Sequence, residues 1–336
     1  VTARGLEAAR AADRVVVRTR THPSAQGLTD AGIAFESFDE LYERCRSYET
    51  LVKAIVRELR RMGKTENVCY CVDGSPAEDR AAQALMKYRS TVVIGGVSKA
   101  AAAAEKAGLG DYLALSAYDV AGAKLSLPLV VYDLAEPSLA GDVKLALADA
   151  FGDEAPAYFV RGGKVKKIAL FEADRQRDYD ATCALAVPDI PLLEKKRFDL
   201  NDFLAILRRL RAPDGCPWDR VQTHQSIRIN AIEEAYELVD AIDADDPVKM
   251  CEEAGDVIMQ AAFHTLIEEE RGNFNMTDVL SEVCEKLITR HTHVFGSDRA
   301  AGADGALTVW DKNKMKEKHQ ETFSDAVNDV PEGFPA

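Results

Sequence analysis

The stretch EEAYELVDAIDADDPVKMCEEAGD, residues 233–256, places two clusters of carboxylates on either side of a short polar turn. The turn sequence DADDP is too short for anything but an antiparallel hairpin of two helices, and Pro247 suits the first position of the second helix. Residues three apart share one face of a helix, so each cluster can direct two carboxylates to one point. The stretch therefore predicts a helical hairpin that gathers acidic side chains.

The two carboxylate pairs are Glu234 with Glu237 and Glu253 with Asp256. An isolated pair of this kind is usually a solvated helix surface, and the first helix fits either interpretation. The second helix continues as AGDVIMQAAFHTLI, which is apolar on nearly every side and predicts burial. Asp256 falls on an apolar stripe of that helix, and a buried carboxylate is costly unless it is paired or bound to a metal. These four residues are therefore candidate metal ligands.

All four candidate ligands offer oxygen, and neither His nor Cys belongs to the set. Hard oxygen donors favour Mg²⁺ or Mn²⁺ and argue against zinc. Four carboxylates exceed what one ion needs once water is counted. We therefore expect more than one ion, with phosphates of a substrate completing the coordination.

A basic segment follows at residues 285–296, EKLITRHTHVFG. Lys286 and Arg290 are spaced to share a helix face, which fits either a salt-bridged surface or a clamp for phosphates. His291 and His293 come at the end of this helix, where capping and the helix dipole explain them better than metal binding does.

The two tryptophans flank this region. Trp218 lies in the turn-rich loop APDGCPWDRVQTH, just before the acidic helix, and Trp310 begins the segment WDKNKMKEK. Each is either a core residue or a platform on which a base stacks. The loop around Trp218 is a candidate lip of the site.

Composition limits the possible partners. The 336 residues predict about two domains, and a formal charge of −14 disfavours binding to nucleic acids or anionic membranes. Phosphate-bearing small molecules stay possible through divalent cations. The seven cysteines are odd in number and lack a Cys-x-x-Cys pair, which favours reduced thiols in the cytoplasm. No apolar run approaches the roughly 18 residues of a membrane span.

The first 172 residues alternate short β-branched runs with alanine-rich helical stretches, which predicts an α/β domain with a largely parallel sheet. The expected strands are 14–19, 67–72, 91–96, 127–134 and 155–160. The expected helices are 2–12, 48–62, 77–88, 98–107 and 138–150. Because the chain begins without Met and almost directly in a helical pattern, we expect this domain to be incomplete at its N-terminus.

Residues 173–197 contain two prolines and no sustained period, which predicts a linker. Residues 198–336 follow a helical period and predict a second, all-α domain. Its expected helices are 198–211, 224–243, 247–271, 277–291 and 305–320.

Five segments in order resemble the MazG family of nucleoside triphosphate pyrophosphohydrolases over about residues 198–320. They are LRRLRAPDGCPWDRVQTHQSI, EEAYELVDAID, EEAGDVIMQAAFH, EKLITRHTHVFG and the pattern W-x-x-x-K-x-x-E-K that starts at Trp310. The resemblance implies an all-α bundle, usually a homodimer, that hydrolyses NTPs or dNTPs to the monophosphate and pyrophosphate with Mg²⁺.

The resemblance also assigns roles to matching residues. The implied metal ligands are Glu234, Glu237, Glu253 and Asp256. The implied substrate-binding residues are Asn230, Glu233, Lys286, Arg290, Trp310 and Lys314, and we add Trp218 from the candidate lip. Either Glu233 or Glu237 would serve as the general base. Ala254 and Thr292 depart from the family's usual Leu and Pro, and neither change affects a proposed ligand.

The first half resembles a tetrapyrrole (corrin/porphyrin) methylase domain of the kind fused to MazG in YabN-like proteins. The matching pieces include LEAARAADRVVVRTRTHP, YCVDGSP and GGVSKAAAAAEKAGL. The family holds S-adenosylmethionine between two α/β subdomains. The first strand and its Gly-rich loop are absent here, and Asp73 replaces the family's usual Pro, which argues against methyl transfer. We expect Asp73, Gly74, Ser75 and Ser98 to border at most a remnant of that pocket.

Three functions follow from these patterns. The leading hypothesis is nucleotide pyrophosphohydrolysis by the second domain. The second is S-adenosylmethionine-dependent methylation of a tetrapyrrole-like substrate, with the helical domain as dimeriser. The third makes the first domain a regulatory or scaffolding module for the hydrolase.

Overall fold

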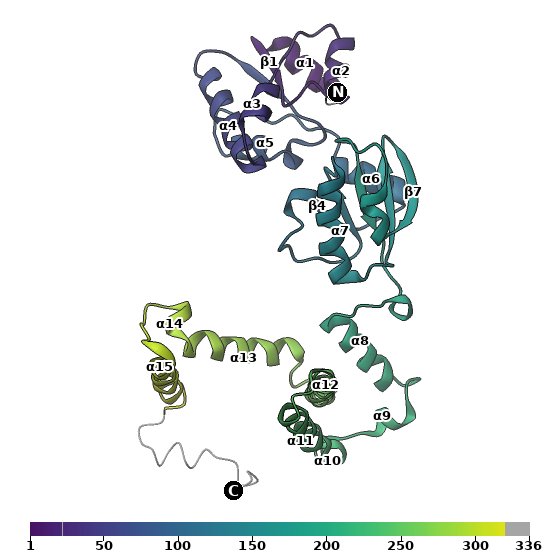
Figure 1. Cartoon of the computed structure of the whole chain (residues 1–336), viewed down its shortest axis with the longest axis vertical. Helices are drawn as coiled ribbons and strands as arrows, with labels where there is room; N and C mark the ends of the chain where they lie inside the picture. Colours follow the sequence, from purple (N-terminus) through teal and green to yellow (C-terminus); the bar gives the residue numbers. More distant parts are fainter. Residues whose placement is uncertain (22, 320–336) are drawn as a thin grey trace. The chain divides into compact units, whose positions relative to one another are not determined.

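The computed structural model describes residues 1–21 and 23–319, and it divides into two units, Val1–Phe198 and Asp199–Ala336. The first unit combines strands and helices, and the second is helical over its described residues (Figure 1). Both features agree with the fold class that the sequence predicts.

A three-stranded sheet forms the start of the first unit, with all strands parallel in the order β2-β1-β3. The strands are β1 (Arg14–Val17), β2 (Glu36–Ser37) and β3 (Val68–Cys71). The helices beside them are α1 (Ala3–Ala11), α2 (Pro23–Asp30), α3 (Asp39–Arg44), α4 (Tyr48–Met62) and α5 (Arg80–Leu85). Helix α4 buries Leu51, Ile55 and Leu59 against one face, since these residues recur at helical spacing.

A five-stranded sheet completes the first unit in the order β4-β5-β8-β6-β7. Its strands are β4 (Leu113–Ser116), β5 (Leu129–Tyr132), β6 (Pro156–Arg161), β7 (Lys164–Ala169) and β8 (Ala184–Val187). Helix α6 (Lys99–Ala107) packs with Val130 and Ala186, and α7 (Pro137–Phe151) packs with Val131 and Leu185, so helices cover both faces. Short 3-10 turns lie at Pro76–Glu78, Ala117–Asp119, Leu170–Arg175 and Leu192–Glu194.

The first unit departs from the sequence prediction in several places, and β2, β4, β7, α2 and α3 lie outside the expected strands and helices. The second sheet is mixed and not largely parallel, because only β4 and β5 run parallel in it. Residues 91–96 form no strand, and Val92 and Val93 are exposed. The expected linker 173–197 contains β8, which pairs with both β5 and β6. The run ALAV is buried at all four positions, so it lacks the alternation that marks a half-exposed strand.

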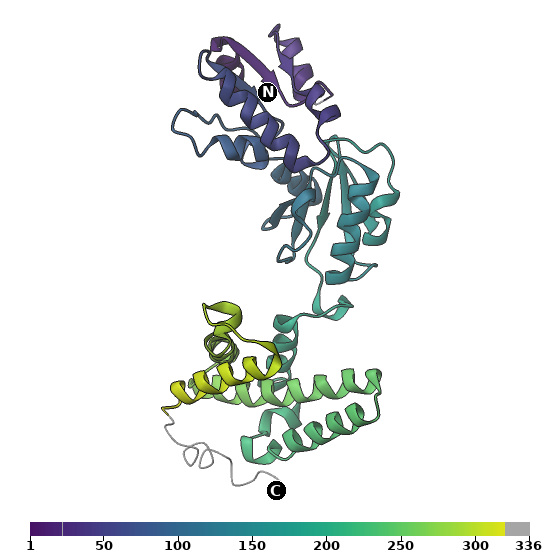
Figure 2. The same ribbon diagram turned by 60° about the vertical axis from the view of Figure 1, so that its left-hand side comes forward.

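The second unit is built from helices joined by short loops. They are α8 (Leu200–Arg211), α9 (Pro217–Val221), α10 (His224–Ile227), α11 (Asn230–Asp243), α12 (Pro247–Arg271), α13 (Met276–Arg290), α14 (Thr292–Phe295) and α15 (Gly302–Glu317). The expected helix 224–243 is broken into α10 and α11. Helices α11 and α12 lie side by side as the expected hairpin (Figure 1, Figure 2).

The hairpin is fixed at its turn by Asp246, whose side chain accepts hydrogen bonds from the backbone N–H groups of Val248 and Lys249, both at 3.1 Å. The core of the unit joins α8, α10 and the second half of α12 through Leu204, Ile227 and Leu266. The first half of α12 is more open than its composition predicts, because Ile258 is exposed. The acidic clusters therefore lie at the less buried end of the hairpin.

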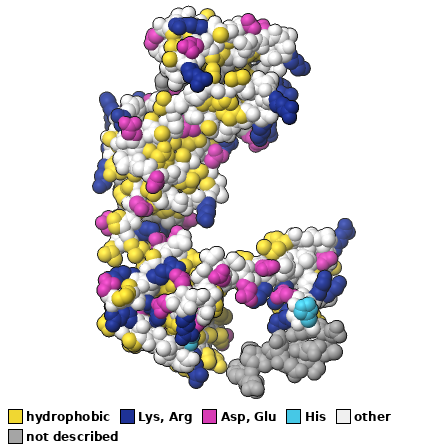
Figure 3. All heavy atoms as spheres, turned by 180° about the vertical axis from the view of Figure 1, so that it is seen from behind, with side chains coloured by type: hydrophobic (Ala, Val, Ile, Leu, Met, Phe, Trp, Pro, Cys, Tyr) yellow, Lys and Arg dark blue, Asp and Glu magenta, His cyan; other side chains and the backbone are white. Residues whose placement is uncertain are grey.

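Charged side chains of both signs are interspersed over the face that Figure 3 shows. No helix within residues 1–21 and 23–319 combines the length and apolar character needed to cross a membrane.

Candidate metal centre

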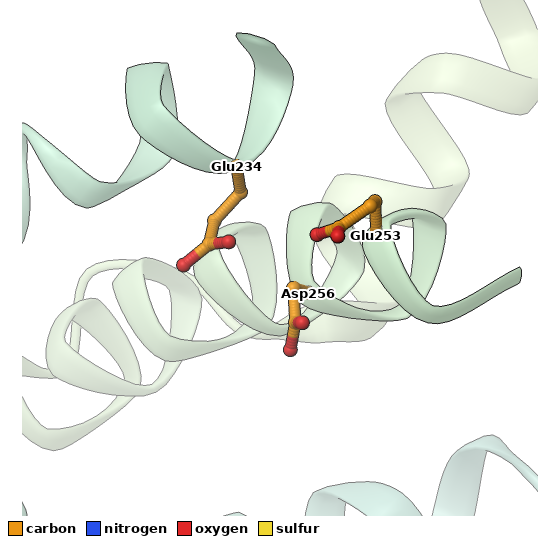
Figure 4. Close-up of side chains that lie close together, drawn as sticks. All are labelled: Glu234, Glu253 and Asp256. Atoms are coloured by element: carbon orange, nitrogen blue, oxygen red, sulfur yellow. The ribbon is translucent and has the colours of Figure 1, made fainter. Parts of the chain in front are cut away.

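Three carboxylates from two helices meet in the hairpin. Glu234 reaches from α11, while Glu253 and Asp256 reach from α12 (Figure 4), and one oxygen of each lies within 4.8 Å of the others. Glu253 is buried, with 5% of its surface exposed, and the other two are half-buried. The sequence singled out Asp256 as the buried ligand, whereas the fold buries Glu253 most deeply. This oxygen-only set suits a hard divalent cation.

The carboxylates destabilise one another when ionised. Burial raises the pKa of Glu253, and the charges of Glu237 and Glu252 raise it further. Burial also raises the pKa of Glu234, with added repulsion from Asp256 and Glu237. A divalent cation would relieve this repulsion, because it favours the charged form of every carboxylate around it. The residues present therefore fit a metal ion.

The fourth predicted ligand, Glu237, is exposed and lies at the edge of the cluster. It raises the pKa of Glu253, so it faces the same space without belonging to the group of three. Glu233 is also exposed, and its charge contributes to the raised pKa of Glu234. Asn230 begins α11 and is half-buried.

A second group of predicted residues gathers between α13 and α15. The guanidinium of Arg290 lies 5.3 Å from the centre of the Trp310 ring, and the ammonium of Lys314 lies 5.1 Å from it. Arg290 also donates to both oxygens of Glu317, at 2.9 and 3.0 Å, which raises the pKa of the arginine and lowers that of the glutamate. The structure thus brings Arg290, Trp310 and Lys314 together.

This basic and aromatic group is separate from the carboxylates. Within residues 199–319 no hydrogen bond, ion pair or ring contact joins the two groups. Lys286 pairs with Glu282 one turn earlier, at 2.6 Å.

The remaining aromatic and histidine candidates have clear positions. Trp218 on α9 is 61% exposed, which excludes a core role within this unit. The Nδ1 atom of His291 lies 2.7 Å from the carbonyl oxygen of Leu287, and its ring contacts His293. His291 is therefore the C-cap of α13, as the sequence indicates, whereas His293 lies within α14.

In the first unit, the residues expected to border a remnant S-adenosylmethionine pocket surround the side chain of Glu78. Glu78 accepts hydrogen bonds from the Ser75 backbone N–H at 3.1 Å and from the Ser98 hydroxyl at 2.5 Å. It also accepts from the backbone N–H groups of Lys99 and Ala100, at 2.8 and 3.1 Å. Gly74 has a positive φ of 79° and packs against the Lys99 side chain. The polar groups at the start of α6 are thus satisfied internally.

A line of polar residues along α12 carried no role in the sequence interpretation. Gln260 donates to Glu234 at 3.4 Å, and His264 meets His224 with their Nδ1 atoms 2.8 Å apart. The only sign of this line in the sequence is that Glu253, Gln260 and His264 share one helical stripe. The spacing could not show which residues of other helices they contact.

Comparison with known proteins defines the class. Residues 222–295 match the MazG nucleotide pyrophosphohydrolase domain, and this segment contains all three clustered carboxylates. The helical unit therefore carries a hydrolase domain of the MazG class.

The chain belongs to the same family as the uncharacterized protein YabN of Bacillus subtilis. The two are 32% identical over 346 residues, which cover 97% of this chain and 70% of YabN.

Further relatives match only the helical part. The nucleoside triphosphate pyrophosphohydrolase/pyrophosphatase MazG of Thermotoga maritima is 43% identical over 124 residues, 37% of this chain and 47% of that protein. The nucleoside triphosphate pyrophosphohydrolase of Escherichia coli is 36% identical over 138 residues, 41% of this chain and 52% of that protein. The chain thus matches about half the length of these two relatives.

Two solved structures resemble parts of this chain, and both have low TM-scores. A MazG-related protein from Thermotoga maritima has a TM-score of 0.30 and 22% identity, covering 34% of this chain and 98% of that one. The conserved hypothetical protein APE0931 from Aeropyrum pernix has a TM-score of 0.36 and 18% identity, covering 57% of this chain and 81% of that one.

Proposed function

We propose that the helical unit hydrolyses nucleoside triphosphates to the nucleoside monophosphate and pyrophosphate, with Mg²⁺ or Mn²⁺ as the metal. The observation that carries this proposal is the convergence of Glu234, Glu253 and Asp256 inside the MazG segment. The names of the relatives from Thermotoga maritima and Escherichia coli support the substrate class.

The proposed chemistry divides between the clustered carboxylates and their neighbours. A bound divalent cation supplies charge neutralisation for a triphosphate and lowers the pKa of a water molecule. Glu234, Glu253 and Asp256 would hold the cation, and Glu237 or Glu233 would accept the proton of the attacking water. The new bond joins the water oxygen to the α-phosphorus, and the bond from this phosphorus to the bridging oxygen breaks. Pyrophosphate leaves with that oxygen.

We assign the nucleotide's other contacts to the second group of residues together with Lys286 and Asn230. Arg290 and Lys286 would bind phosphates, Trp310 would stack on the base with Lys314 beside it, and Asn230 would border the nucleotide. In the structure, the carboxylate of Glu317 accepts two hydrogen bonds from the guanidinium of Arg290. A phosphate would bind this guanidinium in the same bidentate geometry. A bound phosphate would therefore displace this carboxylate. Trp218 stays our candidate for the lip of the site because its ring is exposed.

We also propose a homodimer formed through the helical unit. Helices α11 and α13 expose a set of large apolar side chains that a second copy would cover. The set comprises Ile232, Tyr236, Val239, Val283, Leu287 and Ile288. Light scattering of the purified chain tests this, with twice the monomer mass expected. The seven free thiols support a cytoplasmic location.

For the first unit we propose a scaffolding or regulatory role within a tetrapyrrole methylase-like fold. One observation favours this role over methylation. The carboxylate of Glu78 accepts the hydrogen bonds of Ser75, Ser98 and the backbone N–H groups at the start of α6, so these donors are already satisfied within the chain. Calorimetry with S-adenosylmethionine tests it. Heat of specific binding would contradict the proposal and support the methyltransferase.

The hydrolase proposal is tested by a panel of NTPs and dNTPs with Mg²⁺, followed by detection of pyrophosphate. Glu253→Gln and Asp256→Asn are expected to abolish release, because each removes a ligand charge while keeping the side-chain shape. Glu285→Gln is the matched control, since its side chain is exposed and is not among the groups that shift the pKa of Glu253. Full turnover by both ligand variants would refute the site assignment.

A further inference from the structure

Glu234 is the one clustered carboxylate that comes from α11. Its distance from Glu253 and Asp256 therefore depends on how α11 is held against α12. Helix α11 packs along α12, with Ala241 buried and Leu238 half-buried, while Tyr236 and Val239 are 57% and 49% exposed. Polar contacts add to this packing in the alignment of Glu234.

Gln260 supplies a polar contact at the cluster itself. It follows Asp256 by one helical turn on α12, is half-buried, and donates from Nε2 to Oε1 of Glu234 at 3.4 Å. A neutral amide can hold one carboxylate oxygen while leaving the other free. Lys or Arg in this place would instead compete with a cation for the carboxylate. The amide is thus suited to orient a metal ligand.

A second contact joins α10 to α12 one turn further along α12. The Nδ1 atoms of His224 and His264 are 2.8 Å apart, and Nε2 of His224 lies 2.6 Å from Oε1 of Glu268. Arg271 and Asn273 hold the Glu268 carboxylate in place, at 2.7 and 2.5 Å. His224 lies on α10, which leads within a few residues into α11. The histidine pair therefore anchors the beginning of the helix that carries Glu234.

We propose that Gln260 is a positioning residue that holds Glu234 at cation-binding distance from Glu253 and Asp256, supported by the His224–His264 pair. This inference rests on the proposed function for the presence of a cation site. It goes further in assigning a role to the polar stripe of α12 beyond the ligands.

The test is the variant Gln260→Met, which keeps the length of the side chain and removes the donor. We expect calorimetry with Mg²⁺ or Mn²⁺ alone to show about threefold to tenfold weaker binding, the effect of losing one hydrogen bond. Hydrolysis should need correspondingly more cation, while kcat at saturating cation stays near the wild-type value. Gln225→Met on α10 is the matched control, because that side chain is exposed and should leave cation affinity unchanged.

A merely structural role for Gln260 would lower the melting temperature without moving the cation affinity, and that result would overturn the proposal. His264→Phe provides a second variant, which keeps a ring but breaks the contact with His224. It should also weaken cation binding, and unchanged affinity would remove the histidine pair from the account. A wild-type chain that binds cation yet hydrolyses no nucleotide would refute only the proposed function. A wild-type chain that binds no cation would overturn both.

Discussion

Glu253 combines burial with like-charged neighbours, so its ionised form is unfavourable in the folded chain. A carboxyl whose folded pKa lies above its unfolded pKa stabilises the fold below the unfolded value. That contribution is lost as the pH rises through the folded pKa. Near neutral pH the cation-free cluster should therefore cost stability, and a bound cation should restore it.

The variant Glu253→Gln should melt at a higher temperature than the wild type when no divalent cation is present at neutral pH. The same variant should lose most of the rise in melting temperature that Mg²⁺ gives the wild type. Thermal melting with and without Mg²⁺ measures both effects, with Glu285→Gln as the exposed control. A lower melting temperature of Glu253→Gln would show that the carboxylate stabilises the fold directly.

The histidine pair predicts a pH dependence in the opposite direction. Burial and the neighbouring His224 lower the pKa of His264, while hydrogen bonds from Asn273, His224 and Arg271 lower the pKa of Glu268 to about 2. The stability that His264 contributes is therefore complete above its unfolded pKa of about 6.5 and is lost as the pH falls through the folded value. Glu268 stays ionised throughout this range.

The wild type should thus lose more stability between pH 7 and pH 5 than His264→Phe does, an interval of about two pH units around the unfolded histidine pKa. Melting curves of both proteins across this range measure the difference. Parallel curves would show that His264 has the same pKa in the folded and the unfolded chain, which would contradict this prediction.

The sequence predicts which residues of the site share a face of one helix, but not which residues of two helices contact each other. Spacing placed Glu253 and Asp256 on a shared face, and the structure brings them together with Glu234. The contact of Gln260 with Glu234 could not be predicted, because the offset between two helices depends on packing that a single helix does not encode. For the same reason Glu237 was expected among the ligands but lies at the edge.

At the scale of elements, the hairpin turn depends on one cap. Asp246 accepts from two N–H groups at the start of α12, and replacing such a cap by Ala typically costs about 1 kcal/mol. We expect Asp246→Ala to lower the free energy of unfolding by about this amount and to weaken cation binding, since the cap fixes the start of the ligand helix. Denaturant unfolding and calorimetry measure the two effects.

Asp243→Ala in the same turn is the control, because its side chain is exposed and has no hydrogen bond among the described residues. An Asp246→Ala variant with wild-type stability would show that Pro247 alone is enough to start α12.

Long elements with a strong period were predictable, and short buried ones were not. Helix α4 has the predicted bounds because its apolar residues recur regularly and Ser47 caps it. Helix α12 also has the predicted bounds, between a capped start and Gly272 in the left-handed region. Strand β8 was missed because four buried residues show no alternation. Residues 91–96 have strand-forming side chains but no pairing partner among the described strands.

At the scale of the whole molecule, the two units are expected to act independently in hydrolysis. If the first unit is a scaffold, residues 199–336 alone should hydrolyse nucleotides within about twofold of the full chain, as expected for a domain with its own core. Steady-state rates of the two proteins at equal concentration test this. A large change in either direction would mean that the first unit regulates the site.

In the proposed reaction, the carboxylates of the α11–α12 hairpin direct water to the α-phosphorus of a nucleoside triphosphate. The most direct measurement is the identity of the products when the full chain is incubated with an NTP and Mg²⁺, read by chromatography. We expect nucleoside monophosphate and pyrophosphate in equal amounts. Nucleoside diphosphate with inorganic phosphate, or intact triphosphate across the whole nucleotide panel, would contradict it.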